Sequence, residues 1–311
     1  ASLRQAIADA EADLSRDKSA ARRSEPGRTM SSLGRGDVIV CRKGRRRRHG
    51  IVLQVGADRT GTPTITVLGE DARVVALTFP SSPLAARVGE TVVTGLPLRS
   101  AIADLANRRA TSEGAAQARR EAAERLGVDP EAPTLLVTGG SLGALHMNES
   151  MTGGADALPE GAQVVHLTGR GKDEPVRAAV EAAGLSDRWH VIDYLRTMED
   201  ALAVADLVVC RSGAGTVAEM EALGLPCIYV PLPIGNGEQR LNAKDHVEAG
   251  GAQLIDDKDF TADFVRSNVF PLLGSTRLAE MAAASQSLGR AGAARALADL
   301  ALAQVKEDGH E

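Results

Sequence analysis

Aromatic residues are scarce in this chain of 311 residues, where phenylalanine, tyrosine and tryptophan together make up 2% of the sequence. The hydrophobic core must therefore be built from aliphatic side chains, and a surface that stacks nucleic-acid bases on aromatic rings is disfavoured. No apolar run approaches the roughly 20 residues that a membrane-spanning helix needs. No secretion signal is recognisable, so we expect a cytoplasmic protein.

Cysteine is also rare, and the three cysteines, Cys41, Cys210 and Cys227, lie far apart in the sequence. No Cys-x-x-Cys or His-Glu-x-x-His spacing is present, which argues against a zinc site. Cys210 and Cys227 lie in apolar runs, so we predict that both are buried, reduced thiols. The pair Asp257 and Asp259 resembles a metal-binding Asp-x-Asp, but its charged neighbours favour a solvated segment.

The net charge of −5 conceals a division between two parts of the chain. Residues 1–93 contain 16 Lys and Arg against 10 Asp and Glu, whereas the remainder contains 20 against 31. Such asymmetry indicates two modules with different surfaces.

The first module begins with apolar residues at helical spacing, which predicts a helix and linker over residues 1–30. Four short β-type runs then follow between turns, at 38–40, 51–55, 64–68 and 74–77. We expect them to form a small, basic, antiparallel β-barrel over residues 31–90. The proline-containing segment 80–83 reads as the exit linker.

From residue 134 onward, short apolar strands alternate with helical patterns. This alternation is typical of βαβ units, so residues 94–311 are predicted to form an α/β domain with a six-stranded parallel sheet. Ligands of such domains bind outside the carboxyl ends of the strands. The expected strands are 134–138, 163–167, 190–192, 206–210, 227–230 and 253–255.

Two glycine-containing loops between a predicted strand and a helix are candidate phosphate sites. The first contains Ser141 within GGSLGA, and the second is CRSGAGTVAE, with Ser212 as the expected N-cap and Glu219 one turn into the helix. Glycine lets backbone N–H groups approach a phosphate, and a helix N-terminus adds positive potential. A carboxylate at Glu219 could accept both hydroxyls of a ribose. An ordinary turn and simple helix-dipole compensation are the competing interpretations.

A third loop, PLPIGNGEQRLN, leads into a helix that carries Gln239 and Asn242 on one face. Amides there suit hydrogen bonding to sugar hydroxyls, although a solvated helix start would read the same way. No GxxxxGK[ST] motif is present, which disfavours a P-loop NTPase. The histidines are scattered without a defensible Ser-His-Asp arrangement, so no catalytic residue is predicted.

Together and in this order, these loops resemble the C-terminal domain of the MurG-type glycosyltransferases. The resemblance is carried by TGLPLR (94–99), LLVTGGSLGA (135–144), ADLVVCRSGAGTVAEMEALGLPCIYVPLP (205–233) and GNGEQRLNA (235–243). It implies a Rossmann-like domain of the GT-B fold. It also implies inverting, metal-independent and cofactor-free transfer of N-acetylglucosamine from UDP to an undecaprenyl-pyrophosphoryl-muramyl-pentapeptide lipid in peptidoglycan synthesis.

The resemblance also implies a role for each matching residue of the donor site. Arg99 would contact the diphosphate with Ser141 beside it, and Leu195 would pack on the uracil. Glu219 would hold the ribose. Ala214, Gly215 and Thr216 would offer backbone donors to the nucleotide. Gln239 would contact the sugar hydroxyls, with Asn242 supporting it.

The acceptor-binding half of that family is not recognisable in residues 1–93. LGRGDVIV (33–40), the Arg45, Arg46, Arg47 and Arg48 run and GIVLQV (50–55) instead resemble the KOW/SH3-like insertion of a bacterial Ski2-like helicase. The implied fold is therefore a Rossmann-like domain preceded by a helix and a small SH3-like barrel.

Two further partners follow from these features. The basic run is a candidate RNA-binding patch, which gives the alternative function of a nucleic-acid-binding module. It could also contact anionic lipid, consistent with a location on the inner face of the cell membrane. Finally, the Ala- and Leu-rich stretch 278–305 is expected to be helical and to leave an apolar stripe exposed.

Overall fold

The computed structural model describes residues 38–43, 46–57, 63–69, 74–82, 84–86, 89–140, 144–233 and 237–308. The predicted N-terminal helix lies outside these residues. The chain divides into two compact units. The larger unit comprises Thr78–Ser82 and Thr94–Ala294, and the smaller comprises Ala1–Leu77, Pro83–Val93 and Arg295–Glu311.

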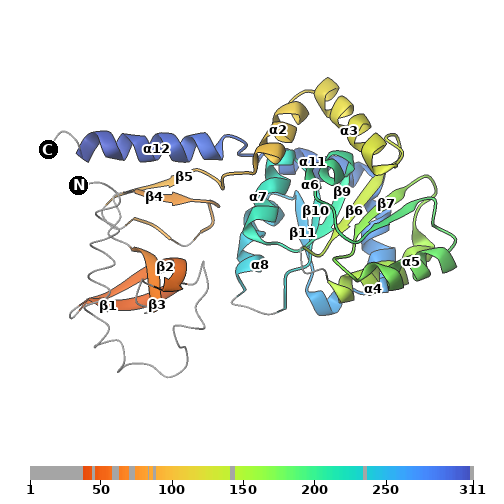
Figure 1. Ribbon diagram of the computed structural model, residues 1–311, viewed down its shortest axis with the longest axis horizontal. Helices are drawn as coiled ribbons and strands as arrows, with labels where there is room; N and C mark the ends of the chain where they lie inside the picture. The colour runs from red at the N-terminus through yellow and green to blue at the C-terminus, as the bar shows by residue number, and fades with distance from the viewer. Residues whose placement is uncertain are drawn as a thin grey trace. The chain divides into compact units, whose positions relative to one another are not determined.

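The larger unit is built on a six-stranded sheet in which every strand pair is parallel, as predicted (Figure 1). The spatial order is β11-β10-β9-β6-β7-β8. The chain thus starts in the middle, winds to one edge through β8, and returns to build the other half from β9. The strands are β6 (Thr134–Thr138), β7 (Gln163–Leu167), β8 (Trp189–Ile192), β9 (Leu207–Cys210), β10 (Cys227–Tyr229) and β11 (Ala252–Leu254).

This order is that of a doubly wound Rossmann-type domain, and the winding direction reverses between β6 and β9. The loops that follow two adjacent strands diverge at such a point, one toward each face of the sheet. In domains of this type the ligand crevice lies outside the carboxyl ends of the strands at this point, which is where the chain leaves β6 and β9 toward the glycine-containing loops predicted from the sequence.

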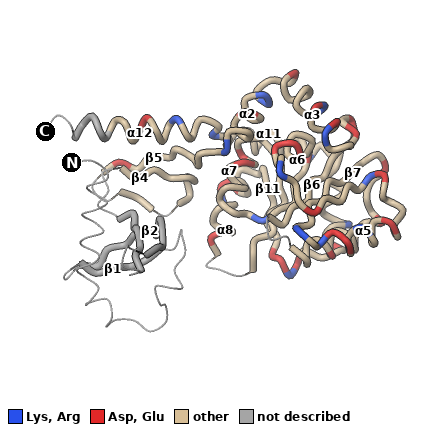
Figure 2. The backbone as a smooth tube through the Cα atoms, viewed as in Figure 1, with Lys and Arg blue, Asp and Glu red and all other residues tan. Residues whose placement is uncertain are grey.

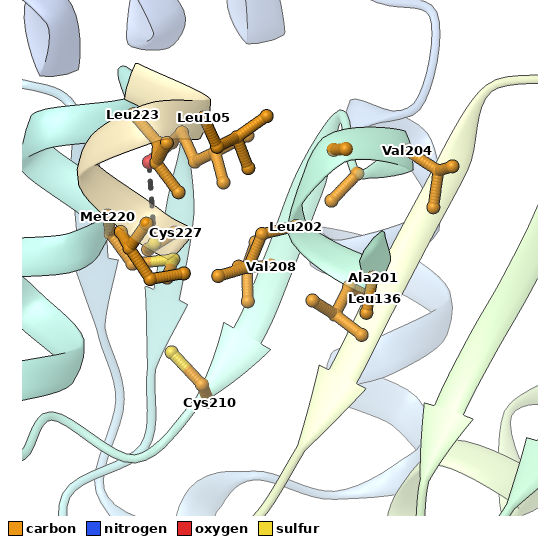
Figure 3. Close-up of a cluster of buried hydrophobic side chains, with 14 of the residues drawn as sticks. Leu105, Leu136, Ala201, Leu202, Val204, Val208, Cys210, Met220, Leu223 and Cys227 are labelled. Carbon is orange, nitrogen blue, oxygen red and sulfur yellow. Dashed lines mark hydrogen bonds between the residues drawn. The ribbon is translucent and has the colours of Figure 1, made fainter. Parts of the chain in front are cut away.

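The strands are apolar throughout because both faces of the sheet are covered. Leu136, Val208 and Cys210 point into one core, together with helix side chains such as Leu105, Leu202 and Met220 (Figure 3). Leu135, Val137 and Val209 point into the core on the other face. Strand side chains alternate between faces, so one short apolar run supplies both cores.

The helices fall into two layers that match the two cores. The first layer contains α2 (Ser100–Arg109), α3 (Ser112–Leu126), α6 (Met198–Val204), α7 (Ala214–Leu223) and α9 (Lys244–Glu248). The short helix α8 (Glu238–Asn242) precedes α9 and has no buried residue. The second layer contains α4 (Leu145–Gly153), α5 (Asp173–Ala182), α10 (Ala262–Phe264), α11 (Thr276–Gln286) and the short turns η4 (Ala155–Ala157), η6 (Val265–Val269) and η7 (Phe270–Leu272). One further turn is η5 (Asp257–Asp259). Charged residues lie mainly on the helices and loops of this unit (Figure 2).

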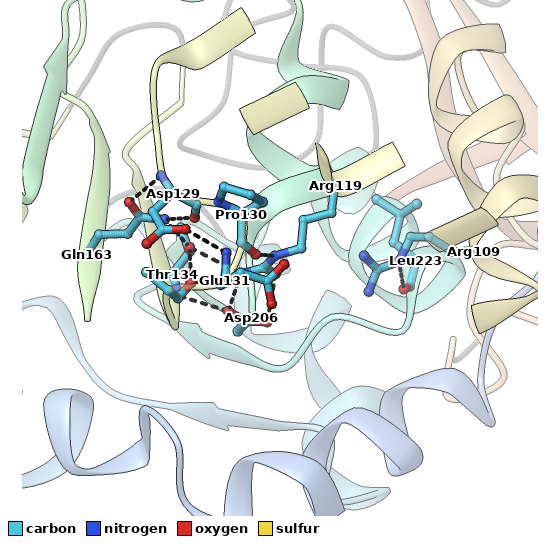
Figure 4. Close-up of polar contacts among 10 residues, drawn as sticks. Arg109, Arg119, Asp129, Pro130, Glu131, Thr134, Gln163, Asp206 and Leu223 are labelled. Atoms are coloured by element: carbon cyan, nitrogen blue, oxygen red, sulfur yellow. Dashed lines mark hydrogen bonds and ion pairs between the residues drawn. The ribbon is translucent and has the colours of Figure 1, made fainter. Parts of the chain in front are cut away.

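A polar network joins β6 and β9 at their amino ends, at the edge of the sheet opposite their carboxyl ends (Figure 4). Arg119 of α3 binds Asp206 in a bidentate manner, with both N···O distances at 2.9 Å. Asp206 also accepts a hydrogen bond of 2.7 Å from the backbone N–H of Thr134, the first residue of β6. The network therefore fixes the two strands that flank the switch point.

The start of the segment 80–83, expected to be the exit linker, is attached to the larger unit. Phe79 is buried in the core of the α/β unit, and the Ser81 N–H donates to Asp245 of α9 at 3.0 Å. Phe79, which directly precedes the segment, is one of the few aromatic residues, and burying its ring stabilises the unit more than exposure to water would.

The smaller unit contains an antiparallel three-stranded sheet formed by β1 (Val38–Lys43), β2 (Arg46–Ala57) and β3 (Pro63–Gly69). The predicted fourth barrel strand is wrong in its partner, because β4 (Val74–Leu77) pairs in parallel with β5 (Glu90–Val93). In the β1–β2 hairpin, Arg42 and Lys43 pair with Arg47 and Arg46. Most of the basic run is thus in paired strands, while Arg45 lies outside the described residues.

The stretch 278–305 forms parts of two helices rather than one. Helix α11 ends at Gln286, and α12 (Ala293–Asp308) follows after a break. Leu297 and Leu302 of α12 are exposed, at 37% and 59%, in line with the expected apolar stripe. Among the described helices, none combines the length and apolarity required to cross a membrane.

Candidate functional site

The N-terminus of α7 lies at the switch point, directly after β9. The helix begins at Ala214, and Gly213 is its N-cap. The N–H groups of Ala214, Gly215 and Thr216 have no acceptor within the helix, so they are free to bind an anionic or carbonyl ligand. Gly215 is exposed, and a Cβ built on it would meet no described heavy atom within 4 Å.

Ser212 is not the N-cap that the sequence suggested. It lies one residue too early, and its hydroxyl is buried without a hydrogen-bond partner among the described residues. The N-cap Gly213 has extended backbone angles and, as a glycine, has no side chain that could cap the helix. No N–H group in the first turn of α7 is therefore capped by a serine side chain, and these donors can bind a ligand.

The loop before α7 is held by Arg211, a residue that the sequence reasoning missed. Its Nη1 donates to the carbonyl oxygens of Val230 and Pro231, at 2.9 and 3.2 Å, and forms an ion pair with Asp257. Asp257 also lies 3.3 Å from Nδ1 of His146 at the start of α4. The expectation that Asp257 is solvated is wrong, because it joins the loops after β9, β10 and β11 to α4. No local sequence signal connects residues so far apart.

Glu219 lies on the same face of α7 as Gly215, one helical turn further on. Its side chain is 16% exposed and forms an ion pair with Arg99, which directly precedes α2. Nε and Nη2 of Arg99 each lie 3.0 Å from Oε1 of Glu219. The structure thus brings together two predicted site residues that are far apart in sequence. The contact between Arg99 and a diphosphate stays a prediction.

Burial raises the pKa of the Glu219 carboxyl, while the charge and hydrogen bonds of Arg99 oppose that rise. A partly desolvated carboxylate with one cationic partner is a typical recognition group for hydroxyl donors, because its remaining lone pairs lack water. Such perturbed groups are concentrated at functional sites.

Gln239 and Asn242 lie on α8, close to the α7 loop. Asn242 Nδ2 donates to the carbonyl oxygen of Ser212 at 3.1 Å, so this amide holds the loop in place. Gln239 Oε1 accepts from the N–H of Leu232 at 3.0 Å, which fixes one end of this amide. The helical pattern of residues 238–249 is divided into α8 and α9, with Ala243 between them buried in the core.

Gln239 also lines a pocket of about 350 Å³ beside α8. The pocket is bounded by the β10–α8 loop, α8 and residues 256–258. This volume suits a single sugar ring or a comparable small group. Neither Arg99 nor Glu219 lines it, so the pocket and the Arg99–Glu219 pair are neighbouring parts of the region around α7 and α8 rather than one cavity.

Leu195 follows β8 and packs partly buried against the core beneath α7, which leaves its proposed contact with uracil a prediction. The adjacent Tyr194 is 44% exposed, and the guanidinium carbon of Arg170 lies 4.0 Å from its ring centroid. Ser141 lies outside the described residues. Gly140 before it has φ of +82°, a backbone conformation that glycine adopts without strain.

The buried histidines do not form an alternative catalytic centre. His166 contacts Asn148 and Trp189, and His246 contacts Tyr229 and Ser285, in both cases inside the protein. Among the described residues, no group of three or more His, Cys, Asp or Glu side chains is arranged to hold a metal ion. Cys210 and Cys227 are buried free thiols, as predicted.

Comparison with known families supports the assignment of both parts of the chain. The model of the glycosyltransferase family 28 C-terminal domain matches residues 134–300. The model of the HelY-like SH3 domain matches residues 24–95, in agreement with the helicase-type resemblance of this region.

Curated relatives extend this comparison. The chain is 46% identical over 243 residues to the UDP-N-acetylglucosamine–N-acetylmuramyl-(pentapeptide) pyrophosphoryl-undecaprenol N-acetylglucosamine transferase of Bifidobacterium longum (strain DJO10A), covering 73% of this chain and 61% of that protein. The protein of the same name from Paenarthrobacter aurescens (strain TC1) is 44% identical over 215 residues, covering 68% and 55%.

A solved structure agrees with the fold. The crystal structure of Acinetobacter baumannii MurG is 25% identical, with a TM-score of 0.58, and the match covers 74% of this chain and 60% of that one. The chain therefore spans about three-fifths of the length of the relatives it matches. With the parallel sheet, the switch-point loops and the family model in agreement, the chain belongs to the glycosyltransferase family 28 C-terminal domain family.

Proposed function

We propose that residues 94–294 bind UDP-N-acetylglucosamine and form the donor-binding half of a hexosyltransferase that acts in peptidoglycan synthesis. The observation that carries this proposal is the arrangement at α7, where the first-turn N–H groups, which have no acceptor within the helix, lie at the switch point one helical turn before the half-buried Glu219. The names of the relatives support the choice of UDP-N-acetylglucosamine as the donor.

In the proposed complex, each part of the nucleotide-sugar meets a group of matching chemistry. Glu219 accepts hydrogen bonds from the two ribose hydroxyls, and Leu195 packs on the uracil. The N–H groups of Ala214, Gly215 and Thr216 face the nucleotide. Gln239 contacts the sugar hydroxyls, and Asn242 keeps the α7 loop in position through its bond to the Ser212 carbonyl.

The proposed reaction is an inverting displacement at the anomeric carbon. A hydroxyl of the lipid-linked muramyl-pentapeptide attacks that carbon while the bond to the UDP oxygen breaks, and the leaving diphosphate gains negative charge. Backbone N–H donors and the guanidinium of Arg99 stabilise that charge as it develops. This stabilisation lowers the activation barrier of the transfer. The proposal uses no metal ion and no cofactor.

Titration calorimetry with UDP and UDP-N-acetylglucosamine tests the donor site. We expect saturable binding that EDTA leaves unchanged and that Glu219→Ala weakens at least about tenfold, because a charge-assisted hydrogen bond is lost. Glu280→Gln, which removes an exposed carboxylate on α11, serves as the control and should bind normally. A chain that binds neither ligand at millimolar concentration would rule out the proposal.

The lipid acceptor and the membrane are proposed partners as well, with the protein placed at the inner face of the cell membrane. Co-sedimentation with vesicles that contain anionic lipid, compared with neutral vesicles, tests this placement. Equal and negligible binding to both would contradict it.

A further inference from the structure

The contact between Arg99 and Glu219 gives Arg99 a task other than binding phosphate. We propose that Arg99 is a positioning residue for the Glu219 carboxylate, which it holds ionised and oriented so that Oε2 faces the ribose diol of the donor. This inference rests on the proposed function, because it concerns how the same site recognises the ribose of a nucleoside diphosphate.

The geometry of the pair is one-sided. Both Nε and Nη2 of Arg99 approach the same oxygen, Oε1, at 3.0 Å. The guanidinium therefore fixes one carboxylate oxygen and leaves the other for a ligand. A ribose diol offers two O–H donors, and an ionised carboxylate only accepts hydrogen bonds, whereas protonation would turn one of its oxygens into a competing donor.

The surroundings of Glu219 make such a partner necessary. Its side chain is 16% exposed, so the charge has lost much of its hydration, whereas the Arg99 side chain is 56% exposed and keeps contact with water. An exposed cation on a half-buried carboxylate stabilises the charge without the cost of burying a second ion.

The backbone of Arg99 is fixed, which allows its side chain to act as a positioning group. Its carbonyl oxygen accepts from the N–H groups of Ile102 and Ala103, both at 3.0 Å, at the start of α2. Ile102 is fully buried in the core that also contains Val217 and Met220 of α7. The two ends of the ion pair are therefore carried by helices that pack into the same core.

Binding measurements with UDP and 2′,3′-dideoxy-UDP separate this role from phosphate binding. Both ligands have the same diphosphate, and only UDP offers the ribose diol. We expect the unchanged protein to prefer UDP by about tenfold or more, the contribution of hydrogen bonds to a charged group. Arg99→Gln should reduce this preference for UDP toward the value measured for Glu219→Gln. Arg99→Lys keeps the positive charge but loses the planar pair of N–H donors, so it should retain part of the preference.

A double-mutant cycle and a control complete the experiment. With Glu219→Gln already present, Arg99→Gln should cause no further loss of preference, since the carboxylate it acts on is gone. Arg277→Gln removes an exposed arginine on α11 that also lies 3.0 Å from its carboxylate partner, and it should leave both affinities unchanged. Unchanged melting temperatures would show that each variant is folded.

The outcomes distinguish this inference from the proposed function. If Arg99→Gln weakens UDP and dideoxy-UDP equally, Arg99 serves the diphosphate alone and the inference is overturned. An unchanged protein that binds both nucleotides with equal affinity would also overturn it, while the donor site would stand. Absence of binding to either nucleotide would reject the proposed function and the inference together.

Discussion

Glu221 is a buried acid on α7 with an unusual environment. The residue is 9% exposed, and its Oε1 has no hydrogen-bond partner among the described residues. Burial, together with the negative charge of Asp245, raises the pKa of its carboxyl to about 7, against the opposing charge of Arg290. The folded protein therefore keeps a proton on Glu221 at pH values where the unfolded chain has released it.

This raised pKa predicts a loss of stability as the pH rises. Between about 4.5 and 7 the folded state binds more protons than the unfolded state, so the free energy of unfolding falls across that window. Glu221→Gln removes the titration. We expect the variant to gain on the order of 1–2 kcal/mol at pH 8, after allowance for solvent screening, and nothing below pH 4.5. Chemical denaturation at several pH values checks this, and an equal gain at all pH values would contradict it.

His166 shows the opposite behaviour because it is buried as the neutral form. Burial lowers its pKa to about 3. The Trp189 indole can only donate, so Nδ1 of His166 accepts at 3.3 Å and Nε2–H donates to Asn148 Oδ1 at 3.0 Å. Asn148 Nδ2 then donates to the Thr168 carbonyl oxygen, and the tautomer and amide orientation are fixed by this chain.

Replacing His166 by phenylalanine should destabilise the protein in a pH-dependent manner. The change leaves Trp189 Nε1 and Asn148 Oδ1 buried without partners, at a cost of about 2–4 kcal/mol near pH 7.5. The native histidine loses stability as pH falls from 6.5 toward 3, since only the unfolded chain takes up the proton. The deficit of His166→Phe should therefore narrow toward pH 5, which urea denaturation measures. A constant deficit would contradict the predicted titration.

At the scale of elements, the network around Asp206 and the site at α7 lie at opposite ends of β9. Asp206→Asn keeps the shape of the side chain but replaces the bidentate ion pair with Arg119 by weaker, partly mismatched hydrogen bonds. We expect a loss of about 2–3 kcal/mol in the free energy of unfolding, because the pair is half-buried. UDP affinity should be unchanged at temperatures where the variant is folded. A parallel loss of UDP affinity would show that the two ends of β9 are coupled.

Elements also show where the sequence pattern was sufficient and where it failed. The strands were predictable to within a residue or so at each end, because short apolar runs bounded by turns have few alternatives in a parallel sheet. The position of the N-cap of α7 and the division between α8 and α9 were not. These depend on which backbone groups find partners in neighbouring loops, such as the Ser212 carbonyl bound by Asn242.

At the scale of the whole molecule, the chain combines a glycosyltransferase family 28 C-terminal domain with a region that matches a HelY-like SH3 domain. We predict that the purified chain binds UDP but forms no lipid-linked disaccharide, because residues 1–93 do not resemble an acceptor-binding half. Incubation with the radiolabelled donor and acceptor lipid tests this. Product formed by the chain alone would contradict it and would place a functional acceptor site within these 311 residues.

The hairpin of β1 and β2, which carries most of the basic run, gives a second prediction for the whole molecule. If it binds RNA, affinity should fall steeply with salt, and replacing Arg45, Arg46, Arg47 and Arg48 by alanine should abolish it. The proposed UDP binding should be unchanged in that variant, since the residues proposed for it belong to the larger unit. Filter binding at 50 and 200 mM salt, roughly the range over which such contacts weaken, provides the measurement. Equal RNA binding by the variant would reject the patch.

The sequence by itself determined the class of fold, the order of strands and helices along the chain, and the loops that carry the site. These features are local: hydrophobic period, glycine and proline positions, and strand–loop–helix junctions are all written in neighbouring residues. The family resemblance added the donor and the expected roles of single residues.

Only the tertiary structure decided which distant residues meet. Residues separated by long stretches of chain come together in the ion pairs of Arg99 with Glu219 and of Arg211 with Asp257. Phe79 is likewise buried among residues distant in sequence. Such contacts are selected by burial and charge compensation after the sheet has formed, and nothing in the local pattern encodes a partner. For this reason the sequence could name Arg99 and Glu219 separately as candidate site residues, whereas the ion pair between them became visible only in the fold.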